Sequence, residues 1–305
     1  MPKIEASEGK KKKIRKIELC DECREEHEFG MVCRSYLRLQ RARVSFELTN
    51  LHVRPETEYY KIIDYYRGSL HEDETGILDR IRTMIEDQPL WNWCSVVSGL
   101  GHVAALTFHS FIRTHVHVEV GDTGVFQRVD IDTAGKPKQY FGLVPGAQLK
   151  SGMKGGFNPL AKGRVLGVIV SGIMMARRGK GDSYYRPLFD AKKYYYRNYS
   201  QYAPALKDPK LCPKYEQCSK KYLRKAKREG RKPKKPTCVG HTHNMAMRWL
   251  GGILVSHATQ LIREGKGLDV TAFKNHHPYI RPKRLKDDVP NPDLLEQIRT
   301  ASHLA

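Results

Sequence analysis

Residues 91–112 read WNWCSVVSGLGHVAALTFHSFI, and this stretch decides the expected fold. Apolar residues on either side of Gly99-Leu100-Gly101 predict a helix, a tight turn and a second helix. Glycines let a backbone come close to a phosphate, and the amides that open the following helix point toward it. Glycines also cap ordinary helices, so a phosphate site and a plain turn both remain open here. Cys94 stands in an apolar context and is predicted to be a core residue.

Two amphipathic helices are predicted upstream, within residues 34–89. Their apolar residues recur at helical spacing: Leu37, Val44, Leu48 and Leu51 in the first, and Ile77, Ile81, Met84 and Ile85 in the second. Residues 55–76 would join them, and the pair is expected to form an antiparallel coiled-coil hairpin with the potential to dimerise.

The residues that follow the turn extend the prediction to the end of the chain. A small β-hairpin is expected over 115–132, a glycine-rich basic loop over 142–167 and a closing helix over 243–264. The fold class is therefore predicted to be mainly α. A helical hairpin at 34–89 is followed by a compact helical, helix-hairpin-helix domain at 90–265 and by a C-terminal tail at 266–305.

The charge of the chain indicates its class of partner. Lys and Arg number 54 against 33 Asp and Glu, a formal net charge of +21, which favours a polyanion such as nucleic acid. An apolar fraction of 40% excludes a disordered polycation. No apolar run is long enough to span a membrane, and the basic start of the chain lacks the apolar stretch of a secretory signal, so a cytoplasmic protein is expected.

Residues 183–238 form the most cationic segment. They hold 17 Lys and Arg against 4 Asp and Glu, a net charge of +13, and nine of the sixteen tyrosines. Cations follow a phosphate backbone and rings stack on unpaired bases, so this basic insert suits single-stranded or irregular RNA. Alternatively, its tyrosines form the core face of one helix.

Two groups of Cys and His residues have the composition of structural zinc sites. The stronger prediction is Cys212-x5-Cys218-x19-Cys238-x2-His241, with His243 as a substitute fourth ligand; this metal would pin the basic insert. The weaker one is a knuckle of Cys20, Cys23, His27 and Cys33, which follows a basic tail within residues 1–33. Reduced thiols without metal are the alternative for both groups.

Four motifs together resemble a known domain. Gly99-Leu100-Gly101-x3-Ala105, Gly142-Leu143-Val144-Pro145, Ser151-Gly152-x-Lys154-x-Gly156 and Tyr184-x4-Phe189, in this order, resemble the C-terminal domain of the bridge-RNA-guided serine transposases over residues 90–265. In that family a serine after the second motif is the nucleophile, and Ser151 matches it. The transposases begin with a RuvC-like domain bearing four acidic ligands, which the first 90 residues here do not resemble. The chain is thus more similar to the nuclease-less, Nop-domain Tas proteins of tandem interspaced guide RNA systems.

This resemblance implies a ribonucleoprotein rather than an enzyme. It implies a homodimer that binds a small guide RNA through a Nop-like domain and recognises target DNA by pairing with that guide. By position, the residues expected to face RNA are Lys150, Lys154, Lys162, Arg164, His243, Asn244 and Arg248. Two alternatives remain: a DNA transposase or recombinase subunit that uses Ser151 as its nucleophile, and a helix-hairpin-helix protein that binds duplex DNA without RNA.

Overall fold

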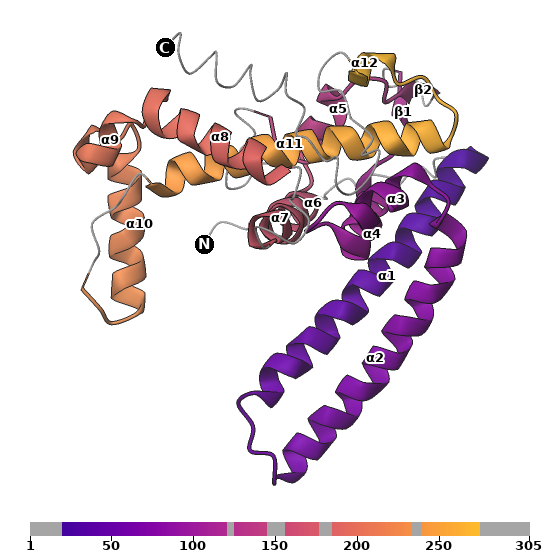
Figure 1. Cartoon of the computed structure of the whole chain (residues 1–305), viewed down its shortest axis with the longest axis horizontal. Helices are drawn as coiled ribbons and strands as arrows, with labels where there is room; N and C mark the ends of the chain where they lie inside the picture. Colours follow the sequence, from indigo (N-terminus) through magenta and orange to yellow (C-terminus); the bar gives the residue numbers. More distant parts are fainter. Residues whose placement is uncertain (1–19, 121–124, 145–155, 177–184, 233–238, 275–305) are drawn as a thin grey trace, which may run out of the picture.

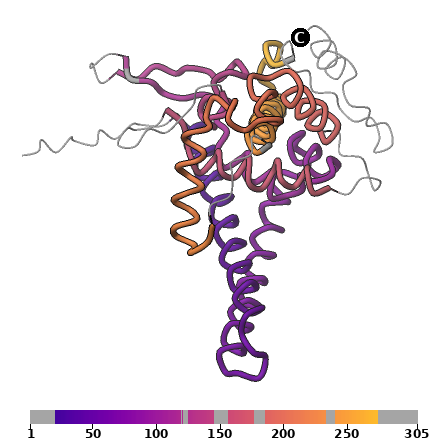
Figure 2. Tube along the Cα trace, turned by 90° about the vertical axis from the view of Figure 1, so that its left-hand side faces the viewer, coloured from indigo at the N-terminus to yellow at the C-terminus, as the bar shows by residue number. Residues whose placement is uncertain are grey.

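The computed structural model describes residues 20–120, 125–144, 156–176, 185–232 and 239–274. Over these residues the protein is mainly helical, with one small antiparallel sheet, which confirms the predicted fold class at that level. A long helical hairpin projects from a compact helical body (Figure 1). In the view turned by 90°, the hairpin forms a narrow stalk below that body (Figure 2). Within the described part of the chain, none of the helices combines the length and the apolar composition that crossing a bilayer requires.

The stalk consists of α1 (Asp21–Asn50) and α2 (Glu58–Ile85). Its base is held by an apolar cluster that includes Cys33, Tyr36 and Ile81. Beyond that cluster, the buried carboxylate of Glu74 accepts a hydrogen bond from the Tyr36 hydroxyl at 3.1 Å and pairs with Arg43 Nε at 2.6 Å. Burial, followed by the charge of Glu74, raises the pKa of Tyr36, so its hydroxyl stays a donor.

The hairpin differs from the prediction in two respects. The first helix begins at Asp21, so residues 21–33 form its opening turns instead of a separate zinc knuckle. The second helix begins at Glu58, within residues 55–76, which were predicted to connect the two helices. The apolar stripe also continues beyond the contact between the two helices. Val44, Leu48, Leu51 and Met84, which were expected to pack inside, are exposed.

The core of the body surrounds the decisive stretch of sequence. That stretch forms α3 (Pro89–Val96), a turn, and α4 (Gly101–Phe111), and Cys94 is buried as predicted. The closing helix α11 (Val239–Gly265) crosses the whole body and packs against α3 and against α8 (Tyr185–Tyr199) (Figure 1). The largest buried side chains of this core are Trp93, Phe108, Phe141, Tyr185 and Phe189.

A close contact between two backbones holds the turn in place. A continuous helical segment runs through α6 (Pro159–Arg164), the π-helical turn η1 (Val165–Val170) and α7 (Ser171–Met175). Gly172 of α7 lies against the turn so closely that a Cβ there would be 2.5 Å from the Gly99 carbonyl oxygen. Gly99 itself has φ +90°, which favours glycine. The missing side chain of Gly99 therefore allows the turn to pack against α7, whereas a Cβ at Gly101 would meet nothing within 4 Å.

The small sheet is attached to the end of α11. Strands β1 (His115–Glu119) and β2 (Phe126–Asp130) pair antiparallel, with His115 opposite Asp130, where the sequence predicts a hairpin. Arg263 of α11 donates hydrogen bonds to the carbonyls of Ile131 at 2.9 Å and Asp269 at 2.8 Å. The short helix α5 (Gly135–Tyr140) follows the sheet, and α12 (Thr271–Lys274) ends the described chain.

The basic insert is helical where it is described. After α8 come α9 (Pro204–Lys207), the 3-10 turn η2 (Pro209–Leu211) and α10 (Tyr215–Arg228), which projects from the body as a second, shorter arm (Figure 1). A small apolar cluster of Tyr202, Ala205 and Cys212 supports this arm. The tyrosines of α8 divide as follows: Tyr185 is buried, Tyr195 and Tyr196 pack against the core, and Tyr194 is 60% exposed.

Candidate metal centre and cationic surface

Two cysteines and two histidines from distant parts of the chain converge at the start of α1. Cys20 is the N-cap residue of this helix, and its sulfur accepts a hydrogen bond from the backbone amide of Cys23. His115 and His117 are two apart on β1, so their side chains leave the same face of the strand. The four ligand atoms all lie within 4.8 Å of one another. This cluster could hold one metal ion.

The distances within this cluster resemble those between ligands of one ion. The Cys23 sulfur is 2.9 Å from His115 Nε2, and the Cys20 sulfur is 3.2 Å from the same nitrogen and 3.5 Å from His117 Nε2. In a tetrahedral site with metal–sulfur bonds of about 2.3 Å and metal–nitrogen bonds of about 2.0 Å, sulfur and nitrogen are separated by roughly 3.5 Å. Small movements of the side chains would bring the four atoms to that spacing.

The electrostatics of the cluster act differently on its two kinds of ligand. Burial first, and then a hydrogen bond with Cys20 and the charges of Cys20 and Glu26, raise the pKa of the Cys23 thiol to about 11, so a metal ion would have to displace its proton. Burial lowers the pKa of His115, and Arg128 adds to the effect, so its imidazole is held neutral, the form that binds metals. His115 Nδ1 lies 3.3 Å from the Thr114 hydroxyl and 3.8 Å from Glu22 Oε2, the kind of outer contact that orients a ligating imidazole.

This cluster corrects the predicted N-terminal knuckle. Cys20 and Cys23 belong to it, but His27 and Cys33 do not. Because α1 is continuous, Cys33 lies about 15 Å along the helix from Cys23, at 1.5 Å per residue, and is buried in the apolar base of the stalk. His27 instead lines a neighbouring cavity. His115 and His117, which complete the cluster, lie more than ninety residues from Cys20 and Cys23 in the sequence. Their His-x-His spacing in a predicted strand is the one sequence signal that could have indicated them.

The other predicted zinc site is partly within the described residues. His241 at the start of α11 lies between two sulfurs: Cys212 is 3.5 Å from its Nδ1 and Cys218 is 3.3 Å from its Nε2. A single ion could use only one of these two nitrogens, so the ring would have to turn to share a metal with both sulfurs. Cys238 lies outside the described residues. His243, the substitute ligand, instead stacks edge-on against Phe189.

Two of the described residues predicted to face RNA influence each other electrostatically. Burial, and then the charge of Arg248 on α11, lowers the pKa of Lys162 on α6. Burial, and then the charge of Arg41 on α1, lowers the pKa of Arg164. The Arg164 side chain donates a hydrogen bond to the Leu37 carbonyl at 3.2 Å. Asn244 is exposed on α11. Lys150 and Lys154, and also Ser151 of the alternative mechanism, lie outside the described residues.

A second group of basic side chains lies on α8 and α11, and of these the sequence predicted only His243 to face RNA. Burial and then Arg197 lower the pKa of Lys193, while burial, Lys193 and Arg197 together lower the pKa of His243. Lys192 lies over the rings of Tyr195 at 4.4 Å and Trp249 at 5.5 Å. Lys192, Lys193 and His243 are half-buried and Arg197 is exposed, and an anion bound beside these side chains and the aromatic rings would stabilise their positive charge.

We use the term cationic face for two groups of basic side chains on α6, α8 and α11: Lys162 with Arg248, and Lys192, Lys193, Arg197 and His243. Within the described part of the chain, none of the lysines and arginines of this face forms an ion pair of its own, although the charge of Asp190 acts on Lys193. Comparisons of the chain with models of protein families, with curated proteins and with solved structures found no match.

Proposed function

We propose that this protein binds a small guide RNA and recognises DNA through pairing with that guide, without a nuclease of its own. The observation that supports the proposal most strongly is the cationic face, a set of basic side chains on α6, α8 and α11 among which Lys162, Lys192 and Lys193 are half-buried. Concentrating unpaired cations costs folding free energy, and a phosphate backbone bound there would offset that cost.

The aromatic residues beside these cations favour RNA over duplex DNA. Tyr194 is 60% exposed on α8, and Tyr195 stacks on Tyr199 with ring centroids 5.8 Å apart. Unpaired bases stack on such rings, whereas the bases of a duplex are already stacked on each other. The arm α10 adds further cations, including Lys220, Lys221 and Arg224, on a helix that projects from the body.

The backbone contact between Gly99 and Gly172 supports the finer part of the fold proposal. A turn that a second helix approaches this closely is compatible with a helix-hairpin-helix, Nop-like domain, in which α4 begins directly after the turn. In such a protein the guide supplies sequence specificity, and the protein recognises the shape and charge of its backbone.

We infer that the metal of the Cys20, Cys23, His115 and His117 cluster is zinc. Two thiolates and two imidazoles form the ligand set of closed structural zinc sites, which leave no position for substrate. The ion would tie the small sheet to the start of α1 and so add to the ion pair between Glu22 and Arg128, which already joins these two elements at 3.0 Å. Elemental analysis of the purified protein tests the identity, and a stoichiometric metal other than zinc would contradict it.

We propose further that the stalk joins two copies of the chain. Its distal part exposes apolar and aromatic side chains on both helices: Val44, Leu48, Leu51, Tyr59, Ile62, Tyr65 and Tyr66. A second stalk would cover them, as in a four-helix arrangement. Light scattering should give a dimeric mass for the full chain and a monomeric mass for Leu48→Glu; a monomeric wild type at micromolar concentration would refute this part.

Binding to a short fluorescein-labelled single-stranded RNA and to duplex DNA of the same sequence tests the proposal directly. We expect tighter binding of RNA, and a salt dependence that weakens by roughly 0.7 in slope for each phosphate contact removed, as in Lys162→Gln and Arg248→Gln. Lys61→Gln is the matched control, because Lys61 is an exposed cation of the stalk. Equal or tighter binding of the duplex would favour the duplex-binding alternative.

A further inference from the structure

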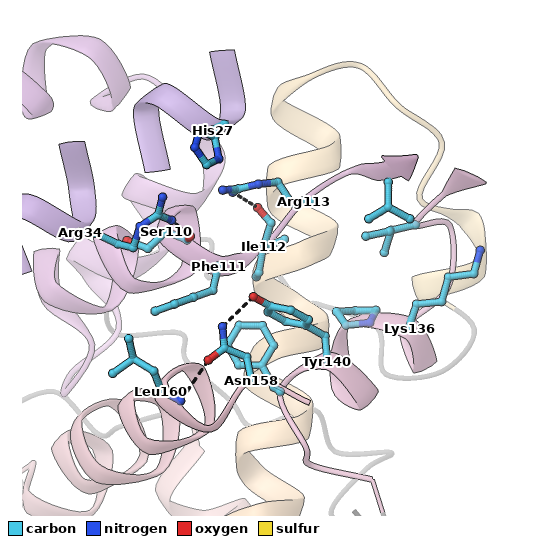
Figure 3. Close-up of a pocket in the computed structure, with 14 residues that line it drawn as sticks. His27, Arg34, Ser110, Phe111, Ile112, Arg113, Lys136, Tyr140, Asn158 and Leu160 are labelled. Carbon is cyan, nitrogen blue, oxygen red and sulfur yellow. Dashed lines mark hydrogen bonds between the residues drawn. The ribbon is translucent and has the colours of Figure 1, made fainter. Parts of the chain in front are cut away.

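A cavity of about 580 Å³ lies beside the metal cluster, between α1, α4, β1 and α5 (Figure 3). Its size is within the range of about 300–1,000 Å³ typical of small-ligand sites. Val116 lines it, and because side chains alternate along a strand, the two histidines next to Val116 point to the other face of β1. The cavity and the metal cluster therefore lie on opposite faces of β1 and are separate sites.

Two arginines form the polar end of this cavity. Arg34 of α1 and Arg113 after α4 converge above Gly30: a Cβ built there would be 3.3 Å from Arg34 Nη1 and 2.9 Å from Arg113 Nη2. Arg34 donates to the Ser110 carbonyl at 2.7 Å and Arg113 to the Ile112 carbonyl at 3.0 Å, contacts that orient both groups and leave other N–H donors free.

The charge of these arginines is not balanced by a carboxylate within the cavity. No acidic side chain is among the described residues that line it. Glu26 acts on Arg113 from outside the cavity, but among the described residues its polar contacts are made by Oε1, which pairs with Lys266 at 2.5 Å and accepts a hydrogen bond from the Thr114 hydroxyl, while its Oε2 has no hydrogen-bond partner. Lys136 at the rim is paired with Asp132 at 2.8 Å. Two adjacent guanidinium groups thus remain available for an anion.

The other walls are flat and apolar. Tyr140 is 42% exposed, and its hydroxyl oxygen accepts a hydrogen bond from Asn158 Nδ2 at 2.8 Å, which fixes the ring at the cavity (Figure 3). Phe111 and Leu160 also line the cavity, and both lie to the left of that ring in the same view. An anion site at one end and an aromatic wall at the other fit the phosphate and the base of a nucleotide.

We propose that this cavity holds one unstacked nucleotide of the bound RNA, its phosphate between Arg34 and Arg113 and its base against Tyr140. The inference rests on the proposed function and adds to it a site remote in sequence from the basic insert. None of the residues expected from the sequence to face RNA lines this cavity among its described members.

The test uses the full-length protein and a short single-stranded RNA that contains thiouridine. After ultraviolet crosslinking, mass spectrometry should find a nucleotide attached to Tyr140 or Phe111. In Arg113→Gln this crosslink should disappear and the affinity for RNA should fall by about 10-fold, since a charge-assisted hydrogen bond is lost.

Gly30→Ala provides a second variant that keeps both arginines. Its Cβ would displace the ends of two flexible side chains and no backbone, so the helix can form while the guanidinium groups move apart. Gly68→Ala in α2 is the matched control, because a Cβ there meets nothing within 4 Å. We expect loss of the Tyr140 crosslink in Gly30→Ala alone, with circular dichroism melts confirming that both variants fold.

The outcomes separate this inference from the proposed function. Crosslinks confined to α8, α10 and α11, with unchanged affinity in both cavity variants, would overturn the cavity inference while RNA binding stands. Absence of RNA binding by the wild type would overturn both. Saturable binding of AMP to the RNA-free protein, combined with no RNA crosslink at Tyr140, would assign the cavity to a free nucleotide and contradict the proposal.

Discussion

The contact between Gly172 and the Gly99 turn gives a prediction whose sign differs from that of an ordinary glycine substitution. Alanine in a helix is more stable than glycine by about 1 kcal/mol, so Gly172→Ala would be stabilising if space allowed. Its Cβ, however, would lie 2.5 Å from the Gly99 carbonyl oxygen, so α7 or the turn must move. The turn cannot yield easily, because the Gly99 Cα itself faces the α7 backbone: a Cβ there would be 2.7 Å from Ile173 Cα.

Overpacking of this kind costs about 1–3 kcal/mol, and more where backbone must shift, so Gly172→Ala should lose about 1–2 kcal/mol of unfolding free energy after the helix gain is counted. Gly163→Ala is the matched control, since Gly163 lies in α6 with nothing within 4 Å of its Cβ position. It should gain about 0.5–1 kcal/mol. Urea unfolding followed by circular dichroism measures both midpoints, and m-values should stay unchanged. A Gly172→Ala midpoint at or above that of the wild type would refute the close contact.

Three other predictions concern the metal, the stalk and pH. Cys23→Ala should lose the bound metal and Cys33→Ala should retain it, as measured by elemental analysis; equal loss in both would restore the knuckle proposed from sequence. Glu74→Ala leaves Arg43 without its buried partner and should cost about 3 kcal/mol in urea unfolding, whereas the exposed Glu72→Ala should change stability by less than about 0.5 kcal/mol. Burial, and then the charge of Lys266, lowers the pKa of His109 from 6.5 to about 4. Between these two values the unfolded chain binds a proton at His109 that the folded protein does not, so the free energy of unfolding should fall as the pH decreases from 6.5 to about 4. His109→Gln should flatten this dependence; an equally steep loss in that variant would assign it to another group.

The sequence predicted the elements that depend on local pattern. Residues 91–112 form the expected helix, turn and helix because their apolar spacing is helical and glycine supplies the φ of +90° at the turn. The β-hairpin followed from alternation of Val116 and Val118 with polar residues. In both cases the information lies within a few residues of the element that forms.

The metal cluster could not be predicted in the same way, because it depends on a tertiary contact. The spacing of Cys20 and Cys23 predicts two ligands, and the nearby His27 and Cys33 have the spacing to complete the set, but the continuity of α1 separates Cys33 from them. The histidines reach the cysteines through the packing of β1 against the start of α1.

The apolar stripe of the stalk shows a different kind of error. Periodicity identified which face of each helix is apolar, but not whether another element covers it. Cys33, Tyr36 and Ile81 are buried because the body of the protein is adjacent, while Leu48 and Leu51 on the same stripe lie beyond its reach. An exposed stripe of this kind is the reason for the proposed dimer.

The central claim is that the protein carries a discrete RNA. Its most direct test is to purify the full-length protein from its own cells under native conditions, extract the nucleic acid and sequence it. We predict one or a few short RNA species of defined length, present in near-stoichiometric amount and released by ribonuclease but not by deoxyribonuclease. Recovery of no discrete RNA, or of duplex DNA alone, would contradict the account.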